Sequence, residues 1–398
     1  MRLTGGICAA FLSLACTAAA AQVDFSGNVE LEARLYPSSP KFPAQHQDRV
    51  SPSVALQPEL RWDFSSGQRL TLVPFLRLDA HDDERTHFDV REFNWLYNAG
   101  NWDVRVGLGR VFWGVTESRH LVDIINQTDL VEDFDEEDKL GQPMINANVI
   151  TSVGTFSGFL LPYFRERTFP GSEGRPSFPL PIDTENPVYE SSRKERHIDV
   201  AVRWQERAGI FDIGLAHFHG TGREPRLVPT LESGGPVLVP HYDIIDQTSV
   251  DAQATIDSWL LKLEAILRSG QGETFFATVA GFEYTIYQVL ESNTDLGLLV
   301  EYHFDGRDEA APPTFFDNDL MVGARLGFND VADSSLLAGA IVDLDTRTTA
   351  LTLEGGTRLA DGLRLEFDAW IFPYVAGGDY LSYVERDHTI RIRLLKFF

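Results

Sequence analysis

The densest set of metal-ligating side chains in the sequence is an acidic run, Glu132–Asp138, with six carboxylates in seven positions. Carboxylate oxygens are the ligands that a hard cation such as Ca²⁺ prefers, and lipopolysaccharide could share a cation bound here. Asp138 stands where an EF-hand calcium loop needs glycine, so a solvated acidic loop is the favoured interpretation. Calcium is the one cofactor that the sequence leaves open, and no other cofactor is predicted.

A histidine pair, His217 and His219, is the second candidate metal site, because both side chains share one face of a predicted strand. A matching third ligand is not apparent, although His197 and His241 are candidates, and histidines without a metal are the favoured interpretation. The sequence contains no HExxH, Walker or dinucleotide-binding motif. The string HGTG at 219–222 has no GxSxG partner, so no catalytic residue is predicted and the chain is not expected to be an enzyme.

The largest set of candidates consists of charged side chains that alternate with apolar ones. In residues 25–36, Val29 and Leu31 fall on one face and Glu30 and Arg34 on the other, a separation that a strand produces and a helix does not. Runs of about ten such residues recur along the chain between turn signals. No segment after the N-terminus approaches the ~18 apolar residues that a membrane-spanning helix requires.

Composition excludes several classes of protein. The chain has 398 residues, with 34 basic and 59 acidic side chains and a formal charge of −25, so a polyanion such as nucleic acid would be repelled. Hydrophobic residues make up 43% and charged residues 23%, which predicts ordered structure.

Residues 1–21 are predicted to be a secretory signal peptide, with Arg2 at the start, an apolar stretch over 7–15 and small residues before Gln22. Both cysteines, Cys8 and Cys16, lie inside it, so the mature chain is expected to have no disulfide. A lipoprotein attached through Cys16 is the less favoured alternative.

About 18 strands are predicted, with 16 as the alternative, and the connections between them alternate between short and long. A soluble sandwich also shows alternating faces but gives no reason for this asymmetry of connections. The fold class predicted for residues 22–398 is therefore all-β, a single closed antiparallel transmembrane β-barrel with short periplasmic turns and long extracellular loops. Aromatic residues near strand ends are expected to form girdles at the membrane interfaces: Tyr36, Trp62, Trp95, Tyr97, Trp102, Trp113, Tyr163, Trp204, Trp259, Tyr284, Tyr287, Tyr302 and Trp370.

Two segments carry a resemblance to known proteins. Residues 389–398, TIRIRLLKFF, resemble the final strand of Gram-negative outer-membrane β-barrels, with Lys396 as a departure from the usual pattern. Residues 109–146, with GRVFWG, DIINQTDL and KLGQPMIN, resemble a group of porin-like outer-membrane barrels of largely unassigned function. The resemblance implies an outer-membrane location, contact with lipid and lipopolysaccharide, and recognition of the strand ending in Phe398 by the barrel-assembly machinery.

An 18-stranded barrel has a wide interior, and the inward-facing charges are candidates for lining a pore. Segregated on opposite walls, they would create a transverse field across the pore; interdigitated, they would form salt-bridge networks that stiffen or block the lumen. The candidates are Arg34, Arg61, Arg77, Arg105, Arg203, Arg325, Arg358, Arg364, Arg391, Arg393, Glu30, Glu59, Asp199, Glu264, Glu283, Glu301, Glu354, Glu366 and Asp368.

The connection over residues 113–142 contains too much apolar surface for a loop in solvent, so it is expected to fold into the barrel mouth or back over the rim. Its candidate constriction residues are Leu121, Ile124, Ile125, Asp129, Glu132, Asp133 and Asp135.

Three functions stay open. A channel for small polar or charged solutes is preferred, with a cation preference expected from the net charge. A transporter of hydrophobic compounds is the alternative, supported by Phe169, Phe178, Phe315 and Phe316 in predicted loops. An occluded structural barrel or a barrel enzyme is the third possibility.

Overall fold

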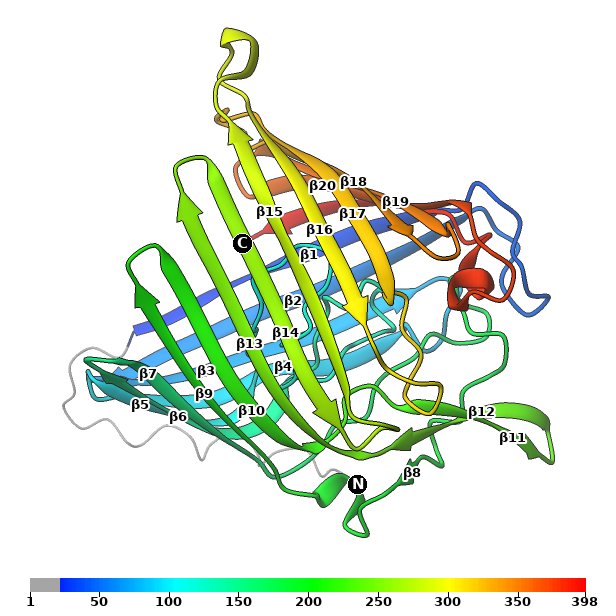
Figure 1. The fold of residues 1–398 in the computed structure, drawn as a ribbon, viewed down its shortest axis with the longest axis horizontal. Helices are drawn as coiled ribbons and strands as arrows, with labels where there is room; N and C mark the ends of the chain where they lie inside the picture. Colours follow the sequence, from blue (N-terminus) through cyan, green and yellow to red (C-terminus); the bar gives the residue numbers. More distant parts are fainter. Residues whose placement is uncertain (1–21) are drawn as a thin grey trace, which may run out of the picture.

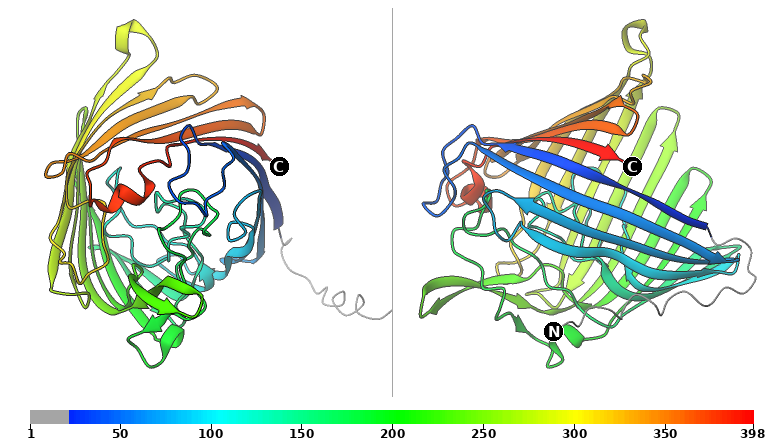
Figure 2. Two further views of the ribbon diagram at one scale, coloured as in Figure 1. Left: turned by 90° about the vertical axis from the view of Figure 1, so that its right-hand side faces the viewer. Right: turned by 180° about the vertical axis from the view of Figure 1, so that it is seen from behind.

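The computed structural model describes residues 22–398; the predicted signal peptide, residues 1–21, lies outside the described residues. Eighteen strands form one antiparallel sheet, which closes because the last strand, β21, pairs with the first, β1 (Figures 1 and 2). The predicted fold class is confirmed. Within residues 22–398, no helix is long and apolar enough to cross a membrane. The barrel strands are β1 (Gln22–Leu35), β2 (Val50–Ser65), β3 (Gln68–Asp79), β4 (His87–Asn98), β5 (Trp102–Gly109), β6 (Gln142–Thr151), β7 (Gly154–Leu161), β9 (Asp199–Ala208), β10 (Phe211–Thr221), β13 (Ile244–Ile256), β14 (Trp259–Ser269), β15 (Phe275–Ile286), β16 (Asp295–Asp305), β17 (Asn318–Gly327), β18 (Ser335–Asp343), β19 (Thr349–Ala360), β20 (Leu363–Tyr374) and β21 (Thr389–Phe397).

The alternation of apolar and charged residues sorts side chains between the two surfaces of the barrel. In β1, Leu31 is 55% exposed on the outer surface, whereas Glu30 and Glu32 on either side of it are 8% and 4% exposed. An apolar outer surface with charged groups turned inward is the reverse of a soluble protein and suits a barrel surrounded by lipid.

Most of the predicted girdle residues lie on the outer surface, but three do not. Tyr36 and Trp113 are buried inside the barrel at 2% and 5% exposed, and Trp370 lines the lumen. The Tyr36 hydroxyl donates to the carbonyl of Arg175 at 2.7 Å, and Trp113 packs on Phe159. For these three the girdle prediction was wrong, since packing inside the barrel takes them away from lipid.

Most connections between strands follow the predicted asymmetry at the two ends of the barrel, but 287–294 and 328–334 at the short-turn end are longer than 270–274 and 344–348 at the loop end. The segments 66–67, 99–101, 152–153, 209–210, 257–258, 287–294, 328–334 and 361–362 lie at one end, and the segments 36–49, 80–86, 110–141, 162–198, 222–243, 270–274, 306–317, 344–348 and 375–388 lie at the other. At the loop end, a small sheet of β8 (Val188–Tyr189), β11 (Arg226–Glu232) and β12 (Gly235–Tyr242) was missed by the sequence analysis, because prolines interrupt its alternation. The 3₁₀ helices are η1 (Lys194–Arg196), η2 (Val289–Glu291) and η3 (Tyr380–Val384).

Candidate functional site

The connection between β5 and β6, residues 110–141, lies inside the barrel and is called the inner loop below (Figure 2). Its apolar residues Leu121, Val122, Ile124 and Ile125 are each at most 6% exposed. They form a hydrophobic core with inward side chains of the β6–β15 wall, which are Met144, Phe159, Leu161, Ala201, Ala216, Phe218, Ile245, Ile266, Phe275, Ala277 and Val279. The inner loop therefore fills the β6–β15 side of the lumen, and its tip reaches the opposite side, along β17–β21, where Phe134 packs on Trp370.

Two buried carboxylates of the wall hold the backbone of the inner loop. Glu264 on β14 accepts from the N–H groups of Val115 (2.7 Å), Thr116 (3.0 Å) and Val122 (3.2 Å). Glu301 on β16 accepts from the N–H groups of Glu117 (2.7 Å) and Ser118 (2.9 Å). These bonds satisfy loop N–H groups that would otherwise lack partners, and the charge of each acceptor strengthens them.

Arginines of β3 and β4 hold the far end of the inner loop. Arg77 contacts Glu132 at 2.8 Å and Glu30 at 2.9 Å, and Arg91 forms a salt bridge with Asp129. Burial alone would raise the pKa of Glu132, but the hydrogen bond from His87 and the charge of Arg77 outweigh it and lower the pKa to about 2. Glu132 is therefore ionised at neutral pH and is engaged in holding the loop.

Asp133 of the inner loop lies at the seam where the barrel closes. Arg391 on β21 forms a salt bridge with its carboxylate, and Arg34 on β1 lies 3.9 Å from the same oxygen. Arg34 also donates to the carbonyl of Glu132. The first and last strands are thus joined by their backbone ladder and by a shared contact to the loop between them.

Two cavities include the β17–β21 side of the lumen in their lining. The larger one opens at the loop end and contains about 2680 Å³ of empty space, counting the part open to solvent. The second contains about 780 Å³ and reaches toward the short-turn end, where Ser335 and Arg364 line it. The two cavities share five lining residues, Asp135 and Glu137 of the inner loop with Leu337, Glu354 and Trp370 of the wall. This shared ring of residues is called the constriction below.

The structure places the predicted pore-lining residues in three groups. Those that line at least one of the two cavities are Arg34, Arg325, Arg364, Arg391, Arg393, Glu354, Glu366 and Asp368. Those that point inward on their strands but line neither cavity are Arg61, Arg105, Arg358, Glu59 and Glu283. For the third group the pore-lining prediction was wrong, because the inner loop or neighbouring side chains cover them to 8% exposure or less: Arg77, Arg203, Glu30, Asp199, Glu264 and Glu301.

The predicted constriction residues are divided in the same way. Leu121, Ile124, Asp133 and Asp135 line the larger cavity. Ile125 and Asp129 are 0% exposed and Glu132 is 4% exposed, so their assignment to the constriction was wrong: the first packs in the core and the other two bind arginines. Phe134 and Glu137 also line the cavity, although the sequence analysis had placed Glu137 in the candidate cation-binding run and had assigned neither residue to the constriction. Their position beside Asp135 at the tip of the loop was the available signal.

Among the charged side chains that line the two cavities, the basic ones all have salt-bridge partners and some of the acidic ones do not. Every lining Lys and Arg has a carboxylate within 4.0 Å, as shown by the pairs of Arg34, Arg85, Arg119, Lys139, Arg167, Arg175, Arg223, Arg268, Arg307, Arg325, Arg364, Arg391 and Arg393. In the described part of the chain, some lining carboxylates have no salt-bridge partner: Asp82, Asp135, Glu137, Asp319, Asp343, Glu354 and Asp379. The lining therefore has more carboxyl groups than cationic groups, and its free charge is negative wherever these carboxyls are ionised. The arginines are thus arranged in the interdigitated salt-bridge networks that were one of the two predictions. The carboxylates without a salt bridge lie along the two cavities.

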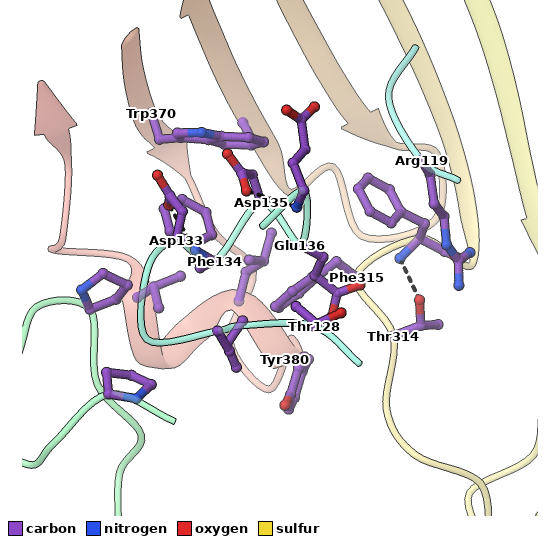
Figure 3. A pocket seen from close by; sticks show the side chains of 18 of the residues that line it. Arg119, Thr128, Asp133, Phe134, Asp135, Glu136, Thr314, Phe315, Trp370 and Tyr380 are labelled. Atoms are coloured by element: carbon purple, nitrogen blue, oxygen red, sulfur yellow. Dashed lines mark hydrogen bonds between the residues drawn. The ribbon is translucent and has the colours of Figure 1, made fainter. Parts of the chain in front are cut away.

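Aromatic rings line the larger cavity in one contiguous row. Phe178 packs on Phe169 and Tyr383, and Tyr380 packs on Tyr383 and Phe315, with ring centroids 5.0–5.8 Å apart. Figure 3 shows Phe315 and Tyr380 near the tip of the inner loop, where Phe134 faces Trp370 at 5.0 Å. A solute that enters from the loop end therefore passes aromatic faces before it reaches the constriction.

The candidate histidine ligands lie apart from this path, whereas Asp133, Asp135, Glu136 and Glu137 of the acidic run line it. His217 and His219 face outward near the loop end of β10, and Asp246 contacts the first at 3.7 Å and the second at 2.9 Å. Among residues 22–398, His87, Asp129 and Glu132 form one group whose ligand atoms lie close enough together to share a metal ion. Arginines already neutralise both of its carboxylates, which disfavours a cation there. A calcium site within Glu132–Asp138 stays a prediction.

Comparison with known proteins finds likeness in fold and not in sequence. Neither a family model nor a curated protein matches the sequence. Among solved structures, the barrel is similar to a BenF-like porin from Pseudomonas fluorescens Pf-5, with a TM-score of 0.52 and 9% identity over 95% of this chain and 98% of that one. It is also similar to Wzi of Escherichia coli, described as a carbohydrate-binding β-barrel involved in capsule assembly, with a TM-score of 0.52 and 8% identity over 92% and 83% of the chains. The chain has the fold of porin-like outer-membrane barrels.

Proposed function

We propose that the protein is an outer-membrane channel through which small polar or charged solutes diffuse, with a preference for cations. The observation that carries the proposal is the meeting of the two cavities at the constriction, which together follow the wall from the loop end toward the short-turn end. Unpaired carboxylates at that meeting point favour cations, because selectivity is set by the charges at the narrowest part of a pore. The buried arginines and acids away from the path fix the shape of the pore.

The location and partners belong to the same proposal. An apolar outer surface contacts membrane lipid, the loop end contacts lipopolysaccharide, and the barrel-assembly machinery recognises the C-terminal strand that ends in Phe398. The proposed role requires no catalysis and no cofactor.

Neutralising the inner-loop carboxylates of the constriction tests the channel. In planar bilayers under a KCl gradient, the unaltered protein is expected to show a reversal potential on the cation-selective side. The double variant Asp135→Asn, Glu137→Gln should move the reversal potential toward zero with little change in conductance, because it removes charge and retains size. Glu283→Gln is the matched control, since Glu283 points inward but lines neither cavity. Absence of conductance, or an anion preference, would contradict the proposal.

Cation preference is also expected to depend on pH. Burial, together with the neighbouring Asp133, raises the pKa of Asp135 well above its ordinary value. Asp135 is thus neutral at low pH and gains its charge as the pH rises through this raised pKa. Reversal potentials recorded from pH 8 downward should show cation preference falling at pH values where an ordinary aspartate is still ionised. The Asp135→Asn variant should lose this pH dependence, and an unchanged profile would show that Asp135 does not act on the current.

A transporter of hydrophobic compounds is the second candidate, and one observation favours it. Phe169, Phe178, Phe315 and Phe316 all line the larger cavity. Each of the eighteen barrel strands, however, pairs with a neighbour on both sides, so the described wall has no strand-to-strand gap for exit into lipid. Uptake of an uncharged apolar dye into lipid, without measurable ion conductance, would favour the transporter over the channel.

A further inference from the structure

The unpaired carboxylates of the larger cavity lie beside its aromatic rings. Asp135 follows Phe134, whose ring packs on Trp370 at 5.0 Å (Figure 3). Asp379 precedes Tyr380, whose ring packs on Phe315, also at 5.0 Å. Carboxylates and aromatic rings therefore lie next to each other in the lining of the larger cavity.

Asp319 gives a second, independent sign that this cavity lacks a cationic partner. It is 2% exposed, its Oδ2 has no hydrogen-bond partner, and it lines the cavity directly opposite Asp343 in the β17–β18 register. Neither carboxylate has a salt bridge among residues 22–398, and the nearby Arg347 is exposed and likewise has none. Two like charges that face each other without a cation between them are unfavourable, and a proton on one carboxyl or a positively charged ligand relieves the repulsion.

The two kinds of group together identify the chemistry of a ligand. Ring faces attract cations electrostatically, and rings in a row offer flat apolar surface to a ligand of similar shape. Carboxylates whose hydrogen bonds come from backbone and hydroxyl groups, and not from a cation, keep their charge unneutralised and attract the positive end of a ligand. An inorganic cation would use the carboxylates and gain little from the rings, and an anion would be repelled.

On the channel function proposed above, we infer that the preferred solutes are small organic cations in which an ammonium group is carried on an apolar body. The apolar body contacts the row Phe169, Phe178, Tyr383, Tyr380 and Phe315, and the ammonium group moves between carboxylates toward the constriction. Every arginine of the lining already holds a carboxylate, so none competes for the acids that guide the solute.

Block of single-channel current tests this inference with phenethylammonium as the probe. Ethylammonium, which has the charge without the ring, and phenylacetate, which has the ring with the opposite charge, are the comparison solutes. We expect phenethylammonium to halve the KCl current at about a tenfold lower concentration than ethylammonium, because ring stacking and cation–π attraction add to the charge. Phenylacetate should not block over the same range.

Variants separate the contribution of the rings from that of the charges. Phe315→Leu with Tyr380→Leu should raise the half-blocking concentration of phenethylammonium about tenfold, with a smaller shift of the KCl reversal potential than Asp135→Asn produces. Asp135→Asn should weaken block and shift the reversal potential together. Phe276→Leu is the matched control, because its ring is 47% exposed on the outer surface of β15.

The inference and the channel function fail in different ways. If the protein conducts with cation preference but phenethylammonium and ethylammonium block equally, the ligand class is wrong and the channel stands. If the protein does not conduct, the channel is wrong, and calorimetric titration of phenethylammonium into the purified barrel in detergent still tests the site. Binding that is equal in the unaltered protein and in the Phe315→Leu, Tyr380→Leu variant would overturn the inference.

Discussion

Replacing the tip of the inner loop, residues 134–137, by four glycines is expected to raise the single-channel conductance severalfold and to abolish most of the cation preference. The change removes Phe134, Asp135 and Glu137, which line the path, and leaves the anchors Asp129 and Asp133 in place. The two cavities meet at this tip. The effect on conductance should be large because the constriction contributes most of the electrical resistance of a pore and the wide parts contribute little.

The double variant Asp135→Asn, Glu137→Gln is the matched control for the tip replacement. The double variant should change selectivity without widening the pore. The glycine variant should change both selectivity and conductance, so the comparison separates the two effects. Circular dichroism of the purified barrel checks that the glycine variant is folded. A folded glycine variant with unchanged conductance would show that the current does not pass the tip of the inner loop.

Glu264→Gln is expected to release the inner loop and to lower the free energy of unfolding by about 2 kcal/mol. One carboxylate oxygen of Glu264 accepts from Val115 and Thr116, and the other accepts from Val122. The amide nitrogen of glutamine cannot accept the third bond, and the remaining bonds lose the assistance of the charge. Thermal unfolding followed by circular dichroism, together with the rate of current closures in bilayers, measures both effects.

Glu283→Gln is again the appropriate comparison, because Glu283 is an inward carboxylate of the adjacent strand β15, and its recorded contact is Arg325 at 3.7 Å. Glu301→Gln should act in the same direction as Glu264→Gln, since Glu301 holds the neighbouring residues Glu117 and Ser118. An unchanged melting temperature and a steady current in Glu264→Gln would show that the apolar core alone holds the loop.

The barrel could be predicted from the sequence because lipid outside and water inside impose a period of two on every strand. The same reasoning indicated that the inner loop would not stay in solvent, because Leu121, Val122, Ile124 and Ile125 need apolar partners. Both inferences depend only on the types and spacing of residues within a short segment, and these can be taken from a single sequence.

Which inward charges would meet solvent could not be predicted in this way. Glu264, Glu301 and Glu354 have the same local pattern, an acid in mid-strand that directly follows an apolar residue. The first two are nevertheless buried beneath the inner loop, and the third lines the path. The difference is set by which wall the loop packs against. Glu264 and Thr116 are 148 positions apart, and the alternation of residues within a strand cannot predict a contact over that distance in the sequence.

The contact of Asp133 with both Arg34 and Arg391 bears on the order in which the molecule is built. The strands that carry these arginines are synthesised at opposite ends of the chain, and the loop that joins them is enclosed by the finished wall. The shared contact can therefore form only when β1 and β21 lie side by side, and it adds to the stability of their pairing. Pairing of the first strand with the last closes the longest loop in the sequence, so it carries a large cost in chain entropy. The contact of the Asp133 carboxylate with arginines of both strands offsets part of that cost.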